Sequence, residues 1–129
     1  MGEDALYELA EPEGSTYNIK HRTFYFSKNV VLFIKNQQYD KIYFSIFDQL
    51  LRSATSIGAN LVEGIAGSSK NDFLKFYIIA LKSANETKYW LCLIRDTLSI
   101  DKLTIETLIK EADEISKIIA SIVINSKKQ

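Results

Sequence analysis

The chain has 129 residues, of which 47% are hydrophobic, with 16 basic and 16 acidic side chains. The length suits a single domain with its own core, and the zero net charge excludes a strongly basic nucleic-acid-binding protein. The sequence holds no apolar run of roughly eighteen residues and no signal peptide, so we expect no association with a membrane.

The charge is unevenly divided along the chain. Residues 1–19 carry five acidic side chains and no basic one, whereas residues 20–129 carry 16 basic and 11 acidic ones. We expect residues 1–17 to form a loosely ordered acidic tail and residues 18–129 to form the domain. The tail is either solvated or folded onto a basic face of the domain, which it would then screen.

The first two helices are predicted from long apolar periodicity without helix breakers. One should run from Asn18, a good N-cap, to about residue 37, and the next from about 41 to 65. Gly64 and Gly67 are expected to end the second helix with a left-handed C-terminal cap.

The third and fourth helices carry heptad patterns of apolar residues. The third should begin with a capping box, Ser69 and Asp72, and run to about Leu98. The fourth should begin near Thr104 and run to about Asn125. Because all the links are short, the sequence predicts an all-α, antiparallel up-down-up-down four-helix bundle.

A polar face runs along the second helix. Arg52, Ser56, Asn60 and Glu63 fall three or four residues apart, which places them on one side. Serine and asparagine lower helix propensity, so we interpret this face as a polar seam packed between helices. Glu86 of the third helix should lie opposite Arg52, and the two are predicted to form an ion pair that fixes the register. The alternative is two separate surface charges.

The third helix is apolar on more sides than a four-helix bundle requires. Besides its heptad seam it carries a second apolar set, Phe76, Ile79, Trp90 and Leu93. Large exposed apolar patches usually mark interfaces, so this surplus predicts a homo-oligomer. The alternative is that the first helix and the tail cover these side chains.

The sequence lacks the common patterns of catalytic and metal sites. The segment GIAGSSK does not have the spacing of a phosphate-binding loop, and no Glu-x-x-His pair of a di-iron bundle is present. The single His21 has no cluster of metal ligands around it, and Cys92 is expected to be a core residue in a reducing cytoplasm. We therefore expect a cytoplasmic protein that is not an enzyme and has no catalytic residues, metal or cofactor.

Three segments, LLRSATSIGAN, SSKNDF and IALKSANETKYWL, occur in this order in the chain. Over about residues 18–126 the sequence resembles the proteins encoded within intervening sequences of bacterial 23S rRNA genes. The resemblance implies a four-helix bundle that forms ring-like homopentamers. Similar proteins include the accessory variability determinants of diversity-generating retroelements, which bind a reverse transcriptase and nucleic acid through a basic surface. Mostly structural roles are implied for the family's signature positions: Arg52, Ser56, Gly58, Asn60, Asp72, Ala80, Glu86 and Trp90.

Two functions remain open. The first is an oligomer that associates with RNA or DNA through basic side chains of the first and third helices, and the candidates are Lys20, Arg22, Lys28, Lys35, Lys70, Lys75 and Lys82. The second is a scaffold that docks a protein such as a reverse transcriptase, without contacting nucleic acid itself. For the individual lysines the alternative is an ordinary solvated face.

Overall fold

The computed structural model describes residues 18–128. Within this range the chain is all-α, as predicted, and no strand is present. The helices are α2 (Ile19–Asn36), the short 3-10 helix η1 (Lys41–Tyr43), α3 (Phe44–Ala66), α4 (Lys70–Thr97) and α5 (Lys102–Lys127). The predicted acidic tail, residues 1–17, lies outside the described residues.

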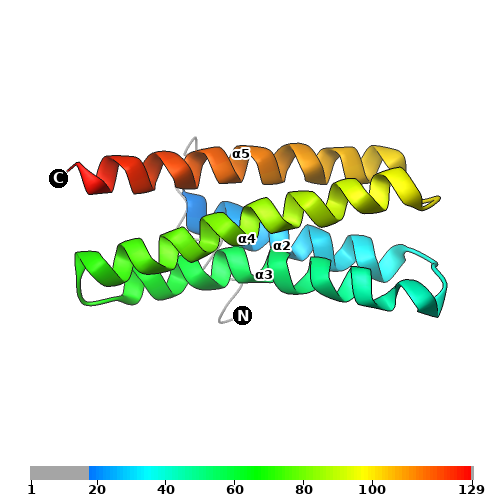
Figure 1. Ribbon diagram of the computed structural model, residues 1–129, viewed down its shortest axis with the longest axis horizontal. Coiled ribbons are helices and arrows are strands. Elements are labelled where there is room, and N and C mark those ends of the chain that lie inside the picture. Colours follow the sequence, from blue (N-terminus) through cyan, green and yellow to red (C-terminus); the bar gives the residue numbers. More distant parts are fainter. Residues whose placement is uncertain (1–17, 129) are drawn as a thin grey trace.

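The four long helices lie lengthwise beside one another, with α4 in front of α2 in the view of Figure 1. Both α3 and α5 pack against α2 and α4, so α2 and α4 occupy opposite corners of the bundle. Hydrogen bonds join Ser53 to Thr87 and Ser56 to Ser83. Residue numbers therefore rise along α3 as they fall along α4.

Each long helix contributes one apolar stripe to a common core. The stripes on α4 and α5 follow the spacing of four and three residues that the heptad patterns predict. Side chains from all four helices are fully buried in this core, among them Phe26, Val30, Leu50, Ile57, Leu91, Ile94, Ile105, Ile115 and Ile119.

Polar side chains cap the starts of the helices. Asn18 Oδ1 accepts a hydrogen bond from the His21 amide at 3.4 Å, and Ser69 Oγ accepts one from the Asp72 amide at 3.1 Å, as the sequence indicates. The fourth helix begins earlier than predicted, because Asp101 is its cap rather than Thr104. The Asp101 carboxylate accepts bonds from the hydroxyl and the amide of Thr104, which also lower the pKa of Asp101.

Gly58 and Gly64 of α3 permit close packing of helices, whereas Gly67 follows the end of the helix. Gly67 has an extended backbone, with φ −65° and ψ 153°, so the predicted left-handed cap was wrong. Gly64 lies inside the helix, and a Cβ atom there would come within 2.9 Å of Tyr77 Cδ1 on α4. A Cβ on Gly58 would meet Thr23 Oγ1 of α2 at 3.1 Å. Both α2 and α4 therefore approach α3 at a glycine.

Two buried hydroxyl groups meet between α3 and α4. Ser53 Oγ and Thr87 Oγ1 lie 3.0 Å apart, and each also reaches a main-chain carbonyl of its own helix. Both residues are buried. Buried hydroxyl groups that satisfy one another stabilise a single relative position of two helices.

We expect the substitutions Ser53→Ala and Thr87→Val each to lower the free energy of unfolding by about 1 kcal/mol. The double variant should lose less than the sum, because the second substitution removes a hydroxyl whose partner is already gone. Urea unfolding of the four proteins measures this. Thr107→Val is the matched control, since Thr107 is exposed and bonds only Leu103 O of its own helix at 2.9 Å. Additive losses would contradict the coupling.

Candidate functional site

The structure places part of the predicted polar seam between α3 and α4. Ser56 Oγ lies 3.0 Å from Ser83 Oγ. Asn60 Nδ2 donates to the carbonyl oxygen of Ser56 at 2.8 Å and to Ser56 Oγ at 2.9 Å. These half-buried groups hydrogen-bond to one another, an arrangement typical of a structural contact between helices.

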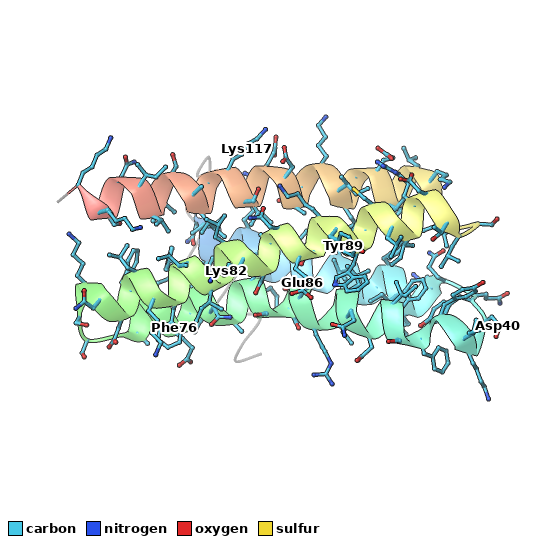
Figure 2. All side chains as sticks on the ribbon, in the orientation of Figure 1. Asp40, Phe76, Lys82, Glu86, Tyr89 and Lys117 are labelled. Atoms are coloured by element: carbon cyan, nitrogen blue, oxygen red, sulfur yellow. The ribbon has the colours of Figure 1, made fainter. Side chains whose placement is uncertain are left out.

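The predicted ion pair between Arg52 and Glu86 is not formed. Arg52 Nε instead contacts Asp48 Oδ2 at 2.9 Å, and the Arg52 side chain is 74% exposed. Glu86 accepts a hydrogen bond from Trp90 Nε1 at 3.0 Å, and it projects from the front of α4 in Figure 2. Both side chains are exposed and find partners one turn away in their own helix, which avoids the desolvation cost of a buried pair.

Two other side chains also differ in position from the sequence-based interpretation. Glu63, assigned to the polar seam, is exposed. Cys92, expected in the core, is a free thiol that is only half-buried and lines a hollow between α4 and α5. His21 is fully buried at the start of α2. Among residues 18–128 no group of three or more His, Cys, Asp or Glu side chains is placed to hold a metal ion.

The candidate basic residues do not gather on one face of a single copy. Lys28 and Lys35 are exposed on α2, and Lys75 and Lys82 are on α4, which occupies the opposite corner of the bundle. Figure 2 shows Lys82 on the front of α4, on the side away from α2. In addition, Lys75 Nζ lies 5.3 Å from the centre of the Phe76 ring. Of the other lysine candidates, Lys20 is half-buried on α2 and Lys70 is exposed at the start of α4.

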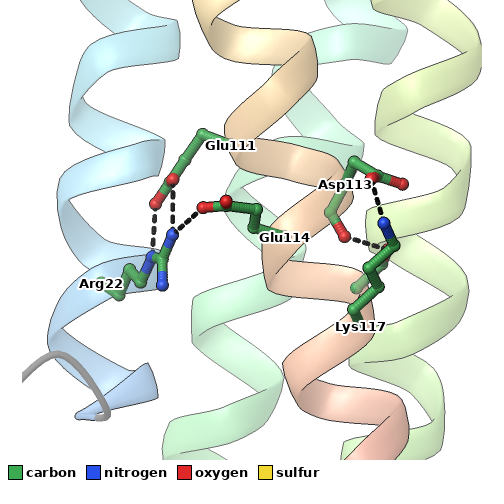
Figure 3. A network of polar contacts seen from close by, with 6 residues as sticks. Arg22, Glu111, Asp113, Glu114 and Lys117 are labelled. Atoms are coloured by element: carbon green, nitrogen blue, oxygen red, sulfur yellow. Dashed lines mark hydrogen bonds and ion pairs between the residues drawn. The ribbon is translucent and has the colours of Figure 1, made fainter.

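Arg22, one of the candidate nucleic-acid-binding residues, is paired with two carboxylates of α5. Its guanidinium donates to both oxygens of Glu111, at 2.7 and 2.8 Å, and also to Glu114 (Figure 3). The hydrogen bond with Glu111 is the main cause that raises the pKa of Arg22 still further above its usual value. Arg22 therefore joins α2 to α5, and its charge is neutralised within the protein.

A second ion-pair network joins α4 to α5. Asp113 Oδ2 contacts Lys117 Nζ at 2.9 Å, and Asp113 Oδ1 contacts Lys88 Nζ at 3.2 Å (Figure 3 shows the first pair). Lys88 also donates to Ser116 Oγ at 3.2 Å. The hydrogen bonds from Lys117 and then Lys88 lower the pKa of Asp113, because they favour its charged form.

No described helix is long and apolar enough to cross a membrane.

The sequence could have indicated both exposed ion pairs within a helix, since Asp48 precedes Arg52 by four residues and Asp113 precedes Lys117 by four. It gave no signal for the contacts of Arg22, because these depend on which helices are neighbours.

The lowered pKa of Asp113 predicts a loss of stability in acid. Its pKa in the folded protein lies below the ordinary value of 3.8, so its contribution is present above about pH 4 and is lost as the pH falls through the folded pKa. Asp113→Asn should therefore be less stable than the wild type at pH 7 and match it near pH 2, measured by thermal unfolding. The pair Lys88→Met and Lys117→Met should reduce the acid dependence in the same way. A constant difference between Asp113→Asn and wild type at all pH values would contradict the assignment.

Comparison with known proteins places this bundle in a family. No curated protein matches the chain. A similar solved structure is that of a protein of unknown function from the S23 ribosomal protein family of Bacteroides thetaiotaomicron VPI-5482, with 37% sequence identity and a TM-score of 0.73. The match covers 81% of this chain and 97% of that one. The family described as 23S rRNA-intervening sequence protein matches residues 15–121. The chain therefore belongs to the 23S rRNA-intervening sequence protein family.

Proposed function

We propose that this chain is a non-catalytic assembly module of the cytoplasm, an up-down-up-down bundle whose copies associate and present a scaffold to a partner. The contacts of α3 with α4 support the up-down order. So do the contacts of α4 with α5, in which Lys88 meets Asp113 and Arg95 meets Glu106, so that residue numbers again rise along one helix as they fall along the next. The function depends on the surfaces that a single copy leaves exposed.

The observation that carries this proposal is an apolar cluster at one end of the bundle, which we name the end patch. It consists of four exposed side chains, Ile42, Tyr43, Phe44 and Leu51. Ile42 is 76% exposed and Phe44 53%. Phe44 and Leu51 also line an open hollow of about 510 Å³ that extends to Ile34 and Tyr39. Clustered apolar side chains around a concavity are typical of protein–protein interfaces.

The end patch is not the surface that the sequence indicated. The predicted surplus lay on α4, but its second apolar set is mostly half-buried, and Ile79 and Tyr89 are the exposed large apolar residues of that helix. Figure 2 shows Tyr89 on the front of α4. The proposed contact between copies therefore centres on η1 and the start of α3, with α4 as a secondary surface.

A ring of five copies, which the family resemblance implies, suits such a surface. In a closed ring each copy uses two different patches, one to bind its neighbour and one to be bound. The end patch supplies one of them. A scaffold of this kind would dock a protein partner such as a reverse transcriptase, and this relation to the accessory proteins of retroelements is part of the proposal.

Light scattering should give a mass that is a multiple of the 14.7 kDa chain. The double variant Phe44→Glu, Leu51→Glu should give a single-chain mass with unchanged helical circular dichroism, because the charges prevent burial of the end patch. Ile124→Glu is the matched control, since Ile124 is 55% exposed near the end of α5, at the other end of the bundle from the end patch (Figure 1), and should leave the mass unchanged. A single-chain mass for the wild type would contradict assembly.

A specific observation supports a second candidate function, association with RNA or DNA. Lys28 with Lys35, and Lys75 with Lys82, are exposed pairs, and each pair is spaced by seven residues on one side of its helix. One copy separates the two pairs, but an assembly would repeat each of them around its surface. Repeated lysines that follow a phosphate backbone bind without base specificity.

Fluorescence anisotropy with a structured RNA at about 50 mM salt tests this second function. Binding should weaken steeply as salt rises, and Lys28→Glu with Lys35→Glu should reduce the slope of log affinity against log salt by roughly 0.9 for each lysine that no longer neutralises a phosphate. The control, Lys127→Glu with Lys128→Glu, changes as many charges at the other end of the chain. No binding to RNA at this salt concentration would exclude the second function and leave the scaffold intact.

A further inference from the structure

The open hollow beside the end patch, between the end of α2 and the start of α3, is lined mainly by aromatic rings. We name it the end hollow, and its volume is about 510 Å³. Its lining includes three aromatic and two aliphatic side chains, Tyr39, Phe44, Phe47, Ile34 and Leu51. Among the described residues that line it, Asp48 alone is charged. The end hollow therefore combines an apolar, aromatic surface with a single carboxylate.

The aromatic rings of the end hollow are held in a fixed arrangement. Tyr39 is stacked on Phe47, with the ring centroids 3.8 Å apart and an angle of 15° between the ring planes. Phe47 is 2% exposed, so its packing in the core holds this stack in place. Phe44 meets Tyr39 nearly at a right angle, with the ring centroids 5.6 Å apart and an angle of 78°. The rings of Tyr39 and Phe44 therefore form a corner, in which a rounded cation can contact two aromatic rings at once.

One oxygen of the Asp48 carboxylate is available to a ligand. Asp48 Oδ2 contacts Arg52 Nε at 2.9 Å, and within residues 18–128 Oδ1 accepts no hydrogen bond. The Arg52 side chain is 74% exposed, and an ion pair as exposed as this one is weak. A cation in the end hollow can therefore approach Asp48 without the loss of a buried ion pair.

The chemistry of the lining favours one class of ligand. A primary ammonium group is strongly hydrated and would lose water against the aliphatic side chains. A neutral apolar group would gain nothing from the carboxylate. A quaternary ammonium group carries a full positive charge beneath apolar methyl groups, so it suits the aromatic rings, the aliphatic side chains and the carboxylate together. We propose that the end hollow binds a quaternary ammonium cation of about the size of choline.

This cation site belongs to a single chain and does not require the proposed assembly. If copies associate through the end patch, a neighbouring copy and the cation compete for Phe44 and Leu51, which belong to both surfaces. The double variant Ile42→Gln, Tyr43→Gln separates the two effects. Both residues are exposed in the end patch but do not line the end hollow, so the variant weakens association and keeps the cation site.

Titration with choline, followed in amide NMR spectra of the full chain, tests the proposal in the wild type and in the Ile42→Gln, Tyr43→Gln variant. Two matched compounds separate the contributions to binding. Dimethylbutanol, in which a carbon atom replaces the nitrogen of choline, has the same shape without the charge. Ethanolamine has the charge without the methyl groups. Circular dichroism checks that each variant is folded.

We expect choline to bind at least about fivefold more tightly than either dimethylbutanol or ethanolamine. Asp48→Asn and Phe44→Leu should each weaken choline binding by about threefold or more, because one removes the charge and the other an aromatic ring. The matched controls are Glu63→Gln, an exposed carboxylate of α3, and Tyr89→Leu, an exposed ring of α4. Neither residue lines the end hollow, so both controls should leave the affinity for choline unchanged.

Equal affinities for choline and dimethylbutanol would overturn the proposal, because the end hollow would then recognise shape alone. It would also be overturned if choline caused no saturable change at the lining residues of either protein. Binding to the variant but not to the wild type would support the site and indicate that a neighbouring copy covers it. A single-chain mass for the wild type would contradict the proposed assembly and leave the cation site unaffected.

Discussion

The close approach of α3 and α4 is the constraint on which the rest of the bundle depends. At Gly64 there is no room for a Cβ atom beside Tyr77, and two turns earlier in α3 the Ser56 hydroxyl lies 3.0 Å from that of Ser83. Apolar stripes that repeat every seven residues would still match after a shift of one heptad. The hydroxyl pairs would not, so these polar contacts select one register for the helix pair.

The helix α5 is attached in a different way. Its apolar stripe completes the core, and ion pairs join it to both neighbouring helices. Arg22 of α2 pairs with Glu111, and Lys88 of α4 pairs with Asp113. The contacts of Arg22 with Glu111 and Glu114 neutralise the charge of α2 on the side that faces α5. Lys28 and Lys35 of α2 are instead exposed to solvent. The electrostatics of the surface thus follow from which helices are neighbours.

Much of the fold could be predicted from the sequence because its determinants are local. The N-caps Asn18 and Ser69 and the heptad stripes depend on residues within one or two turns of each other. The Arg52–Glu86 pair could not be predicted correctly, because charges opposite each other across a helix contact need not turn inward when a partner lies one turn away in the same helix. The predicted burial of Cys92 was wrong for a related reason. Apolar neighbours in the sequence do not show whether a side chain of the helix faces the core or the surface.

The segments that indicated the family and the exposed surfaces of the bundle have different roles. The three segments that indicated the family lie in 50–60, 68–73 and 79–91. They supply both hydroxyl contacts of α3 with α4, whereas the close contact of Gly64 with Tyr77 lies outside them. Most of the end patch and all of α2 lie outside them. Substitutions in the segments act on the register and stability of the bundle, whereas exposed positions of η1 and α2, such as Ile42 and Lys28, can change without disturbing the core. The partner that we propose would therefore be selected by exposed side chains of η1 and α2, where a single apolar or basic residue alters the surface and leaves the packing of α3 against α4 intact.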